Sequence, residues 1–158
     1  MIERGTPTIE VNELIGLDCW RAVFYAGIAL HLGGSEPIAG PERGGTMGTH
    51  IVGTWYAEWV IRCADGRSAD SESDAGAIWE ALSALEAQVR NVSLDAATVE
   101  ITLGFEGGSE FVARPDPAAG PTAEGWEVLL PGDRSVVGYA DGIRLEDSRD
   151  APRFLEDA

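Results

Sequence analysis

Lysine is absent from this chain of 158 residues, in which all 11 basic residues are arginine and 27 residues are acidic. The formal net charge is −16 at pH 7. A chain this acidic repels nucleic-acid phosphates and anionic membrane surfaces, and it attracts basic proteins. The missing lysine also excludes a phosphate loop of the Walker type. We therefore expect a basic protein as partner, with no nucleic acid and no membrane.

Cysteine and histidine are scarce, with two of each. Cys19 and Cys63 stand in apolar, strand-like runs, which favours buried free thiols over a disulfide framework. His31 and His50 do not have the spacing of zinc ligands, and neither cysteine has a partner within four residues. We predict no metal site and no cofactor.

Long apolar runs are missing as well. The longest, around 22–32 and 53–61, are shorter than the roughly 20 residues that cross a bilayer. Residues 1–13 contain three glutamates and lack the apolar core of a signal peptide. Together with the free cysteines, these features predict a protein of the reducing cytoplasm.

Motifs for covalent catalysis are missing too, because no serine stands in a Gly-x-Ser-x-Gly elbow. Carboxylates are numerous, so an acid–base pair cannot be singled out from sequence. Glu58 and Glu124, which stand close to tryptophans, are the first ones to consider. We predict no catalytic residue, and the sequence favours a protein that is not an enzyme.

The chain does contain one series of signals twice. The tetrapeptide Gly-Gly-Ser-Glu at 33–36 returns at 107–110, and Trp59, followed by Arg-Ser at 67–68, returns as Trp126, followed by Arg-Ser at 134–135. In each copy an apolar strand leads to the Gly-Gly turn, a loop rich in Gly and Pro follows, and a Trp-led strand ends at a turn of Asp and Gly. This order predicts two similar antiparallel β-meanders, over about 14–68 and 91–147.

One amphipathic helix is expected between the meanders. An apolar stripe at helical spacing is formed by Ile78, Leu82, Leu85 and Val89. A Ser or Asp side chain can cap the first turn, so the helix should begin near residue 75. Its amphipathic part is expected over about 77–90.

The predicted fold class is therefore α+β, mainly β, in a single domain over 1–158. Eight or nine antiparallel strands form a sandwich or a partly open barrel, with the helix over one face or an open end. The aromatic run at 50–63 reads as one continuous strand region. Residues 37–48 are expected to form a flexible loop, and residues 148–158 an acidic tail.

Aromatic and acidic side chains supply the candidate binding site. The repeat matches Trp59 with Trp126, which is typical of core anchors. Trp55 has no counterpart in the second copy, and Trp79 lies just off the helix stripe, so either can mark an interface or a pocket. The acidic alternation at 70–74 lacks the last ligands of a calcium loop, and helix capping accounts for it. The candidate partner- or ligand-binding residues are Trp55, Tyr56, Glu58, Asp70, Glu72, Asp74 and Trp79.

Part of the second meander carries a family pattern. The pattern consists of Leu103-Gly104-Phe105-Glu106-Gly107-Gly108, Pro115-Asp116-Pro117, Glu124-Gly125-Trp126-Glu127, Pro131-Gly132-Asp133 and Val136-Val137. Residues 101–142 resemble in this respect a family of small uncharacterised domains of GC-rich actinobacteria. The family's Asp-Gly turn is replaced here by Glu-Gly-Gly, and Gly125 separates the acidic residue from the tryptophan. The resemblance implies a β-rich fold and carries no activity and no catalytic residues.

The leading hypothesis is a non-enzymatic cytoplasmic binding protein. Its most concrete form is an inhibitor- or immunity-type protein whose acidic surface docks on a basic nuclease or toxin domain. One alternative is a small-molecule binder or enzyme with a pocket between the meanders, with Trp55, Tyr56 and Glu58 near its mouth and the 37–48 loop as a lid. Another is a structural or oligomerising module that pairs its strand edges, and homo-oligomers are left open.

Overall fold

The computed structural model describes residues 6–37 and 46–147. The predicted acidic tail and most of the predicted lid loop therefore lie outside the described residues. Eleven strands and two α-helices occur in the described ranges, in the order α1 (Pro7–Val11), β1 (Cys19–Phe24), β2 (Ile28–Pro37), β3 (Thr46–Thr54), β4 (Ala57–Arg62), β5 (Ser68–Asp70), α2 (Ala75–Leu82), β6 (Val89–Asp95), β7 (Glu100–Phe105), β8 (Glu110–Pro115), β9 (Glu124–Leu130), β10 (Arg134–Tyr139) and β11 (Gly142–Asp147). Short 3-10 turns occupy Asn12–Leu14, Ser83–Leu85 and Pro117–Ala119.

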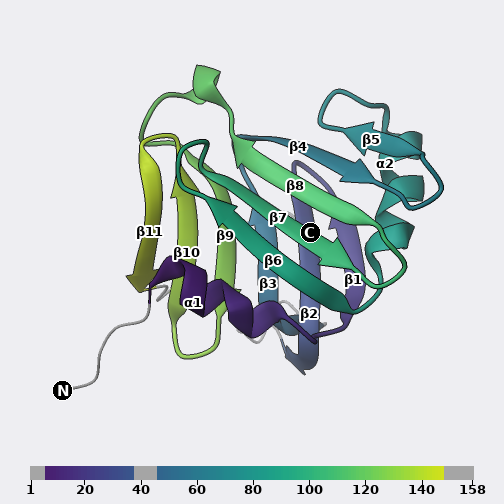
Figure 1. The fold of residues 1–158 in the computed structure, drawn as a ribbon, viewed down its shortest axis with the longest axis horizontal. Helices are drawn as coiled ribbons and strands as arrows, with labels where there is room; N and C mark the ends of the chain where they lie inside the picture. The colour runs from purple at the N-terminus through teal and green to yellow at the C-terminus, as the bar shows by residue number, and fades with distance from the viewer. Residues whose placement is uncertain (1–5, 38–45, 148–158) are drawn as a thin grey trace.

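The strands form two antiparallel sheets that face each other, with the strands of one running across those of the other (Figure 1). The six-stranded sheet has the order β1-β2-β3-β9-β10-β11, and the five-stranded sheet has the order β5-β4-β8-β7-β6. Each half of the chain builds a three-stranded meander in one sheet and then crosses to the other. This arrangement confirms the predicted pair of similar meanders and the mainly β sandwich.

Main-chain hydrogen bonds join the sheets at two corners. At one corner the start of β1 meets the start of β6, where Cys19 N donates to Ala87 O (3.0 Å) and Val89 N donates to Leu17 O (2.9 Å). At the other corner the chain crosses between sheets, and Trp55 N donates to Gly125 O (2.8 Å). The β-sandwich is therefore partly closed.

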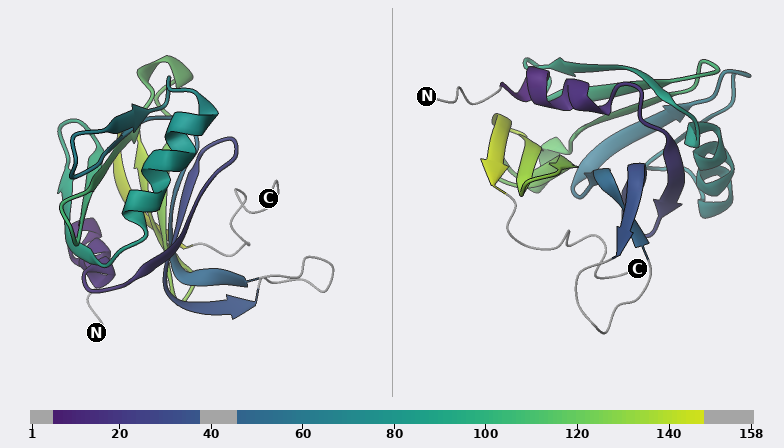
Figure 2. Two further views of the ribbon diagram at one scale, coloured as in Figure 1. Left: turned by 90° about the vertical axis from the view of Figure 1, so that its right-hand side faces the viewer. Right: turned by 90° about the horizontal axis from the view of Figure 1, so that it is seen from below.

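The helices cover the two remaining corners. Helix α2 packs against β1, β4 and β5, and α1 packs against β6, β10 and β11 (Figure 2). No helix in the described ranges is long and apolar enough to span a membrane.

The core lies between the sheets, and the two matched tryptophans belong to it as predicted. Trp126 is fully buried, and its indole Nε1 donates to Val99 O at 2.8 Å. Trp59 is 6% exposed and makes an edge contact with Phe24, with ring centroids 6.2 Å apart. Gly138 leaves room for the Trp126 ring, because a Cβ at position 138 would lie 2.2 Å from Cε2 of that ring.

The prediction of a turn at 33–34 is wrong, because these glycines lie inside β2. The pairing of β2 with β3 shifts register between Leu32 and Ser35, and the strand continues to Pro37. The same tetrapeptide at 107–110 does form the predicted turn, between β7 and β8. Identical residues therefore form a bulge in one sheet and a chain reversal in the other.

The aromatic run at 50–63 is not one strand region. It divides into β3 and β4, which belong to different sheets, and residues 55–56 carry the chain across. Periodicity alone does not show such a crossing, because both strands are rich in apolar residues.

The predicted helix is shorter than expected. Helix α2 ends at Leu82, a 3-10 turn follows to Leu85, and Val89 begins β6. Pairing of Val89 with Leu17 and Phe105 outweighs its place on the helical stripe. Helix α1 and strand β5 are too short, at five and three residues, to produce a periodic signal.

Candidate functional site

Two neighbouring connections at one end of the six-stranded sheet enclose a hollow of about 400 Å³. One connection is the turn between β1 and β2, and the other is the crossing from β3 to β4. We call this space the aromatic hollow, and it is lined by Tyr25, Ala26, Gly27, Ala29, Thr54, Trp55 and Tyr56. No charged side chain belongs to this lining.

The walls of the aromatic hollow are held by local hydrogen bonds. The hydroxyl of Thr54 accepts a bond from Ile28 N at 2.8 Å, and Tyr25 N donates to Gly27 O at 3.0 Å. Position 27 must be glycine, because a Cβ there would lie 2.5 Å from the carbonyl oxygen of Thr54. The two connections are therefore locked together before any ligand arrives.

Exposed aromatic rings extend the hollow towards α2. Tyr25 is 48% exposed, Tyr56 63% and Trp79 44%. Tyr25 meets Trp79 edge to face, with ring centroids 6.5 Å apart. The other large apolar side chains exposed in the described ranges are Ile9 and Ile15. Exposed aromatic rings that gather in one place are a common mark of a binding surface.

A second hollow, of about 420 Å³, lies on the outer face of the five-stranded sheet. We call it the charged hollow, and it is lined by Glu58, Trp59, Val60, Arg62, Asp70, Ser71, Glu72, Glu100, Val112 and Arg114. Its four carboxylates outnumber its two arginines. The two hollows share no lining residue, but they are close along the chain: Tyr56, just before β4, lines the first, and Glu58, within β4, lines the second.

The arginines of the charged hollow already have partners. Arg114 Nη2 lies 2.9 Å from Glu58 Oε2, and Arg62 Nη1 lies 2.7 Å from Glu110 Oε1. The carboxylates of Asp70, Glu72 and Glu100 form no ion pair with any described residue. The charged hollow therefore presents net negative charge to a partner.

The acidic run before α2 is largely used by the main chain. Asp70 Oδ1 accepts from Glu72 N at 2.8 Å, and Asp74 Oδ1 accepts from Ala77 N at 2.9 Å and so caps α2. Asp74 lines neither hollow. No group of His, Cys, Asp and Glu residues in the described ranges is arranged to hold a metal ion.

The structure thus brings together most of the sequence-predicted residues. Trp55 and Tyr56 line the aromatic hollow, Trp79 extends it through Tyr25, and the charged hollow contains Glu58, Asp70 and Glu72. Sequence reasoning missed Tyr25, whose only local signal is an aromatic residue beside a predicted turn.

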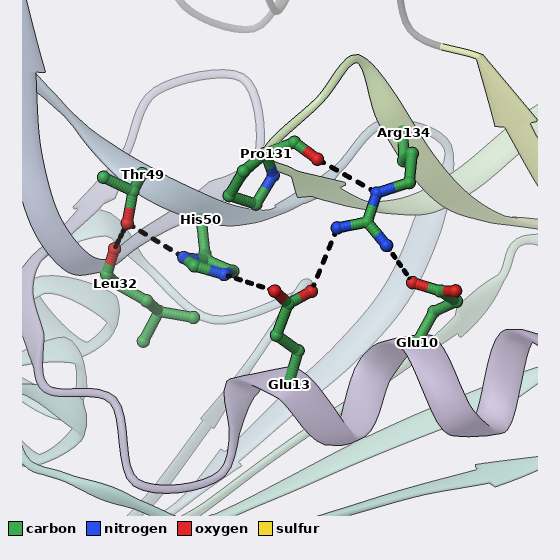
Figure 3. A network of polar contacts seen from close by, with 7 residues as sticks. All are labelled: Glu10, Glu13, Leu32, Thr49, His50, Pro131 and Arg134. Atoms are coloured by element: carbon green, nitrogen blue, oxygen red, sulfur yellow. Dashed lines mark hydrogen bonds and ion pairs between the residues drawn. The ribbon is translucent and has the colours of Figure 1, made fainter. Parts of the chain in front are cut away.

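Apart from the two hollows, a network of polar side chains joins α1 to the six-stranded sheet (Figure 3). Arg134 pairs with Glu10, its Nη2 lies 3.3 Å from Glu13 Oε2, and its Nε donates to Pro131 O at 3.0 Å. Glu10 stands 124 residues from Arg134 in the sequence, so no local pattern could have revealed this contact.

The same network continues to a histidine. Glu13 Oε1 lies 3.8 Å from His50 Nε2, and Thr49 Oγ1 lies 2.9 Å from His50 Nδ1 (Figure 3). The order of hydroxyl, imidazole and carboxylate is that of a hydrolytic triad, but the Thr49 hydroxyl donates its one proton to Leu32 O at 3.4 Å and so does not offer it to the imidazole. Burial lowers the pKa of His50, and nearby Glu13 opposes this effect. We interpret the network as a tether for α1.

Comparisons of the chain with family models, with curated proteins and with solved structures found no match. The resemblance of residues 101–142 to the actinobacterial family therefore stays a prediction, and only the geometry described above bears on function.

Proposed function

We propose that this protein is a non-enzymatic binding protein of the inhibitor or immunity type, and that a basic protein docks across its two hollows. The observation that carries the proposal is that the chain at the start of β4 passes from a hollow with exposed aromatic rings to a hollow with excess carboxylates. Tyr56 and Glu58 stand two residues apart on the chain, and each lines one of the two hollows.

The two hollows would play different parts in binding. Aromatic side chains at the centre of an interface commonly supply about 2 kcal/mol or more each, because they bury large rigid surfaces. Tyr25, Tyr56 and Trp79 are placed to do so. The carboxylates of the charged hollow, added to the net charge of −16, would speed encounter and select for basic partners rather than supply most of the affinity.

The ionisable groups with strongly shifted pKa values lie outside both hollows. Burial raises the pKa of Cys19 to about 12, and burial followed by nearby Arg21 lowers the pKa of His31 to about 4. Neither residue lines either hollow. Active sites usually contain the perturbed groups that perform proton transfer, so their location elsewhere supports a surface that binds.

Two sets of substitutions test the proposal. The aromatic variant is Tyr25→Ser, Tyr56→Ser and Trp79→Ser, and the charge variant is Asp70→Asn, Glu72→Gln and Glu100→Gln. Two matched controls change exposed residues outside both hollows: Ile9→Ser with Ile15→Ser, and Glu86→Gln with Asp133→Asn and Asp147→Asn. Each tagged protein is used to capture partners from a lysate of the source organism, and a recovered partner is purified and titrated by calorimetry.

We expect wild type and both controls to bind one basic protein with equal affinity. The aromatic variant should bind roughly 100-fold more weakly. The charge variant should mainly associate more slowly, and its association rate should depend less on salt concentration. Equal affinity of all five proteins would contradict the proposal, and so would capture of an acidic partner.

A second candidate function is small-molecule binding in the aromatic hollow. Its volume of about 400 Å³ suits a small ligand, and its lining has no charge, which favours an uncharged, aromatic ligand. A fragment screen by NMR distinguishes this candidate from the first. Aromatic fragments that shift the resonances of Trp55 and Tyr56 and bind with micromolar affinity would favour it. If no aromatic fragment binds there, the candidate is contradicted.

A further inference from the structure

Arg21 differs from every other arginine that the structure describes. Six of the seven arginines in the described ranges pair with carboxylates: Arg62, Arg67, Arg90, Arg114, Arg134 and Arg144. Arg21 has no such partner there, although the chain contains 27 acidic residues. It is half-buried on β1. In so acidic a protein, a half-buried guanidinium with no carboxylate partner in the described ranges is unusual.

A bulge in β1 places two consecutive side chains beside one residue of β2. Cys19 pairs with Leu32 and Arg21 pairs with His31, so Trp20 is the extra residue at the register shift. The rings of Trp20 and His31 lie 5.6 Å apart between centroids. Bulges commonly redirect a side chain in this way next to functional sites. Trp20, Arg21 and His31 thus gather on the outer face of the six-stranded sheet.

The ring nitrogens of this group that have no described partner are both hydrogen-bond donors. His31 is fully buried, and its Nδ1 accepts from Gly48 N at 3.1 Å. The neutral ring therefore has its proton on Nε2. His31 Nε2 and the indole Nε1 of Trp20 are both buried, and neither has an acceptor among the described residues. Buried donors are normally paired, so two unpaired donors beside a guanidinium require an explanation.

The histidine is a neutral donor at physiological pH. Burial, and secondly the charge of Arg21, lower its pKa to about 4. Arg21 is therefore the one cation of the group, and the two rings supply uncharged N–H donors.

We propose that Trp20, Arg21 and His31 form a binding site for an anionic oxygen group, a carboxylate or a phosphate. The oxygen atoms of such a group accept hydrogen bonds from all three side chains, and the planar guanidinium matches their geometry. The net charge of the protein does not forbid this, because charges beyond roughly 8 Å are screened at physiological salt. The site lies on the opposite outer face from the charged hollow, so it is independent of the proposed function.

Titration with two simple anions tests this site. Sodium acetate and inorganic phosphate are added separately to ¹⁵N-labelled full-length protein at pH 7, with sodium chloride adjusted to hold ionic strength constant. The chain has five tryptophans, and Trp20→Phe identifies the Trp20 indole resonance. We expect this resonance to shift saturably with at least one anion, at a midpoint of about 1–10 mM. The Trp126 indole, which donates to Val99 O, should not move.

Two variants of Arg21 and one control variant separate this site from general salt effects. Arg21→Gln should raise the midpoint concentration roughly tenfold or more. The midpoint of Arg21→Lys should lie between those of Arg21→Gln and wild type, because lysine keeps the positive charge but lacks the planar guanidinium. Arg90→Gln, at an exposed arginine of the other sheet that lines neither hollow, should leave the midpoint unchanged.

The relative midpoints of the two anions name the ligand class. A lower midpoint for phosphate would identify a phosphate group, and a lower midpoint for acetate a carboxylate. The proposal is overturned if the Trp20 shift stays linear with both anions, or if Arg21→Gln binds as tightly as wild type.

Discussion

The tetrapeptide Gly-Gly-Ser-Glu occurs twice in this protein and has two different structures. At 33–36 it lies inside β2, and at 107–110 it reverses the chain between β7 and β8. Both copies place a glycine in the left-handed region, with φ of +77° at Gly33 and +95° at Gly107. The shared residues therefore meet a shared backbone requirement, while the surrounding strands decide whether the chain continues or turns back.

The difference arises from pairing on either side of the glycines. In the first copy, Ser35 and Glu36 pair with Gly48 and Met47 of β3, so β2 continues past the bulge. In the second copy, Gly108 N donates to the carbonyl of Phe105 at 3.0 Å, which closes a tight turn. Beyond these segments the two halves agree again, because each has a buried tryptophan in the first strand after the chain crosses to the other sheet.

The largest expected loss of stability comes from replacing either of the two matched tryptophans, and the two losses should differ. Trp126→Leu should lower the free energy of unfolding by about 4 kcal/mol, and Trp59→Leu by about 3 kcal/mol. The difference is expected because only the first change leaves the buried Val99 carbonyl without the indole donor that it has in the native protein. Urea unfolding followed by circular dichroism measures both. Equal losses would show that the indole hydrogen bond contributes nothing.

A smaller effect separates the two copies of the tetrapeptide. Gly33→Ala should cost about 2–3 kcal/mol, because it combines a left-handed φ with a Cβ that would lie 2.6 Å from Thr49 Oγ1. Gly107→Ala should cost about 1 kcal/mol, because only the φ is unfavourable and no atom lies within 4 Å of the new Cβ.

A double variant tests the cause of this difference. Thr49→Ala removes the hydroxyl, so in that background the cost of Gly33→Ala should fall towards that of Gly107→Ala, with only one close contact, of 3.3 Å to His50 Nδ1, remaining. If the cost of Gly33→Ala stays the same without the hydroxyl, the close approach does not explain it.

The smallest expected effect is a dependence on pH that comes from the first half alone, since both histidines of the chain, His31 and His50, stand there. The pKa of His31 falls from 6.5 to about 4 on folding, so the unfolded chain binds the proton more readily. The pKa of His50 is lowered as well. Stability is therefore complete above about pH 6.5 and is lost as pH falls from there towards 4.

Between pH 7.5 and 5.5 the loss for His31 should be roughly 1 kcal/mol, measured by urea unfolding at each pH. His31→Gln should flatten this dependence, and His50→Gln should reduce it less. An unchanged slope in His31→Gln would assign the dependence to other groups.

Local patterns predicted those parts of the fold that depend on neighbours in sequence. The cap before residue 75, where a Ser or Asp was expected and Asp74 caps α2, and the turn at 107–108 both stand where they were expected. The end of α2 and the division of the 50–63 run were not predictable in this way, because partners from the other half of the chain decide both. The candidate site shows the same limit: Trp55 and Trp79 stood out in the sequence as aromatics outside the matched core positions, whereas Tyr25 joins them only through folding.

By itself, the sequence determined the composition of this protein, its acidic charge, its mainly β character and the repeat of its meanders, because charge and strand propensity are properties of residues and their near neighbours. The tertiary structure alone decided which residues meet. It placed Tyr25 against Trp79, Glu10 beside Arg134, and Trp20 and Arg21 over His31, because strand register and sheet packing are set by burial and hydrogen bonding between distant segments.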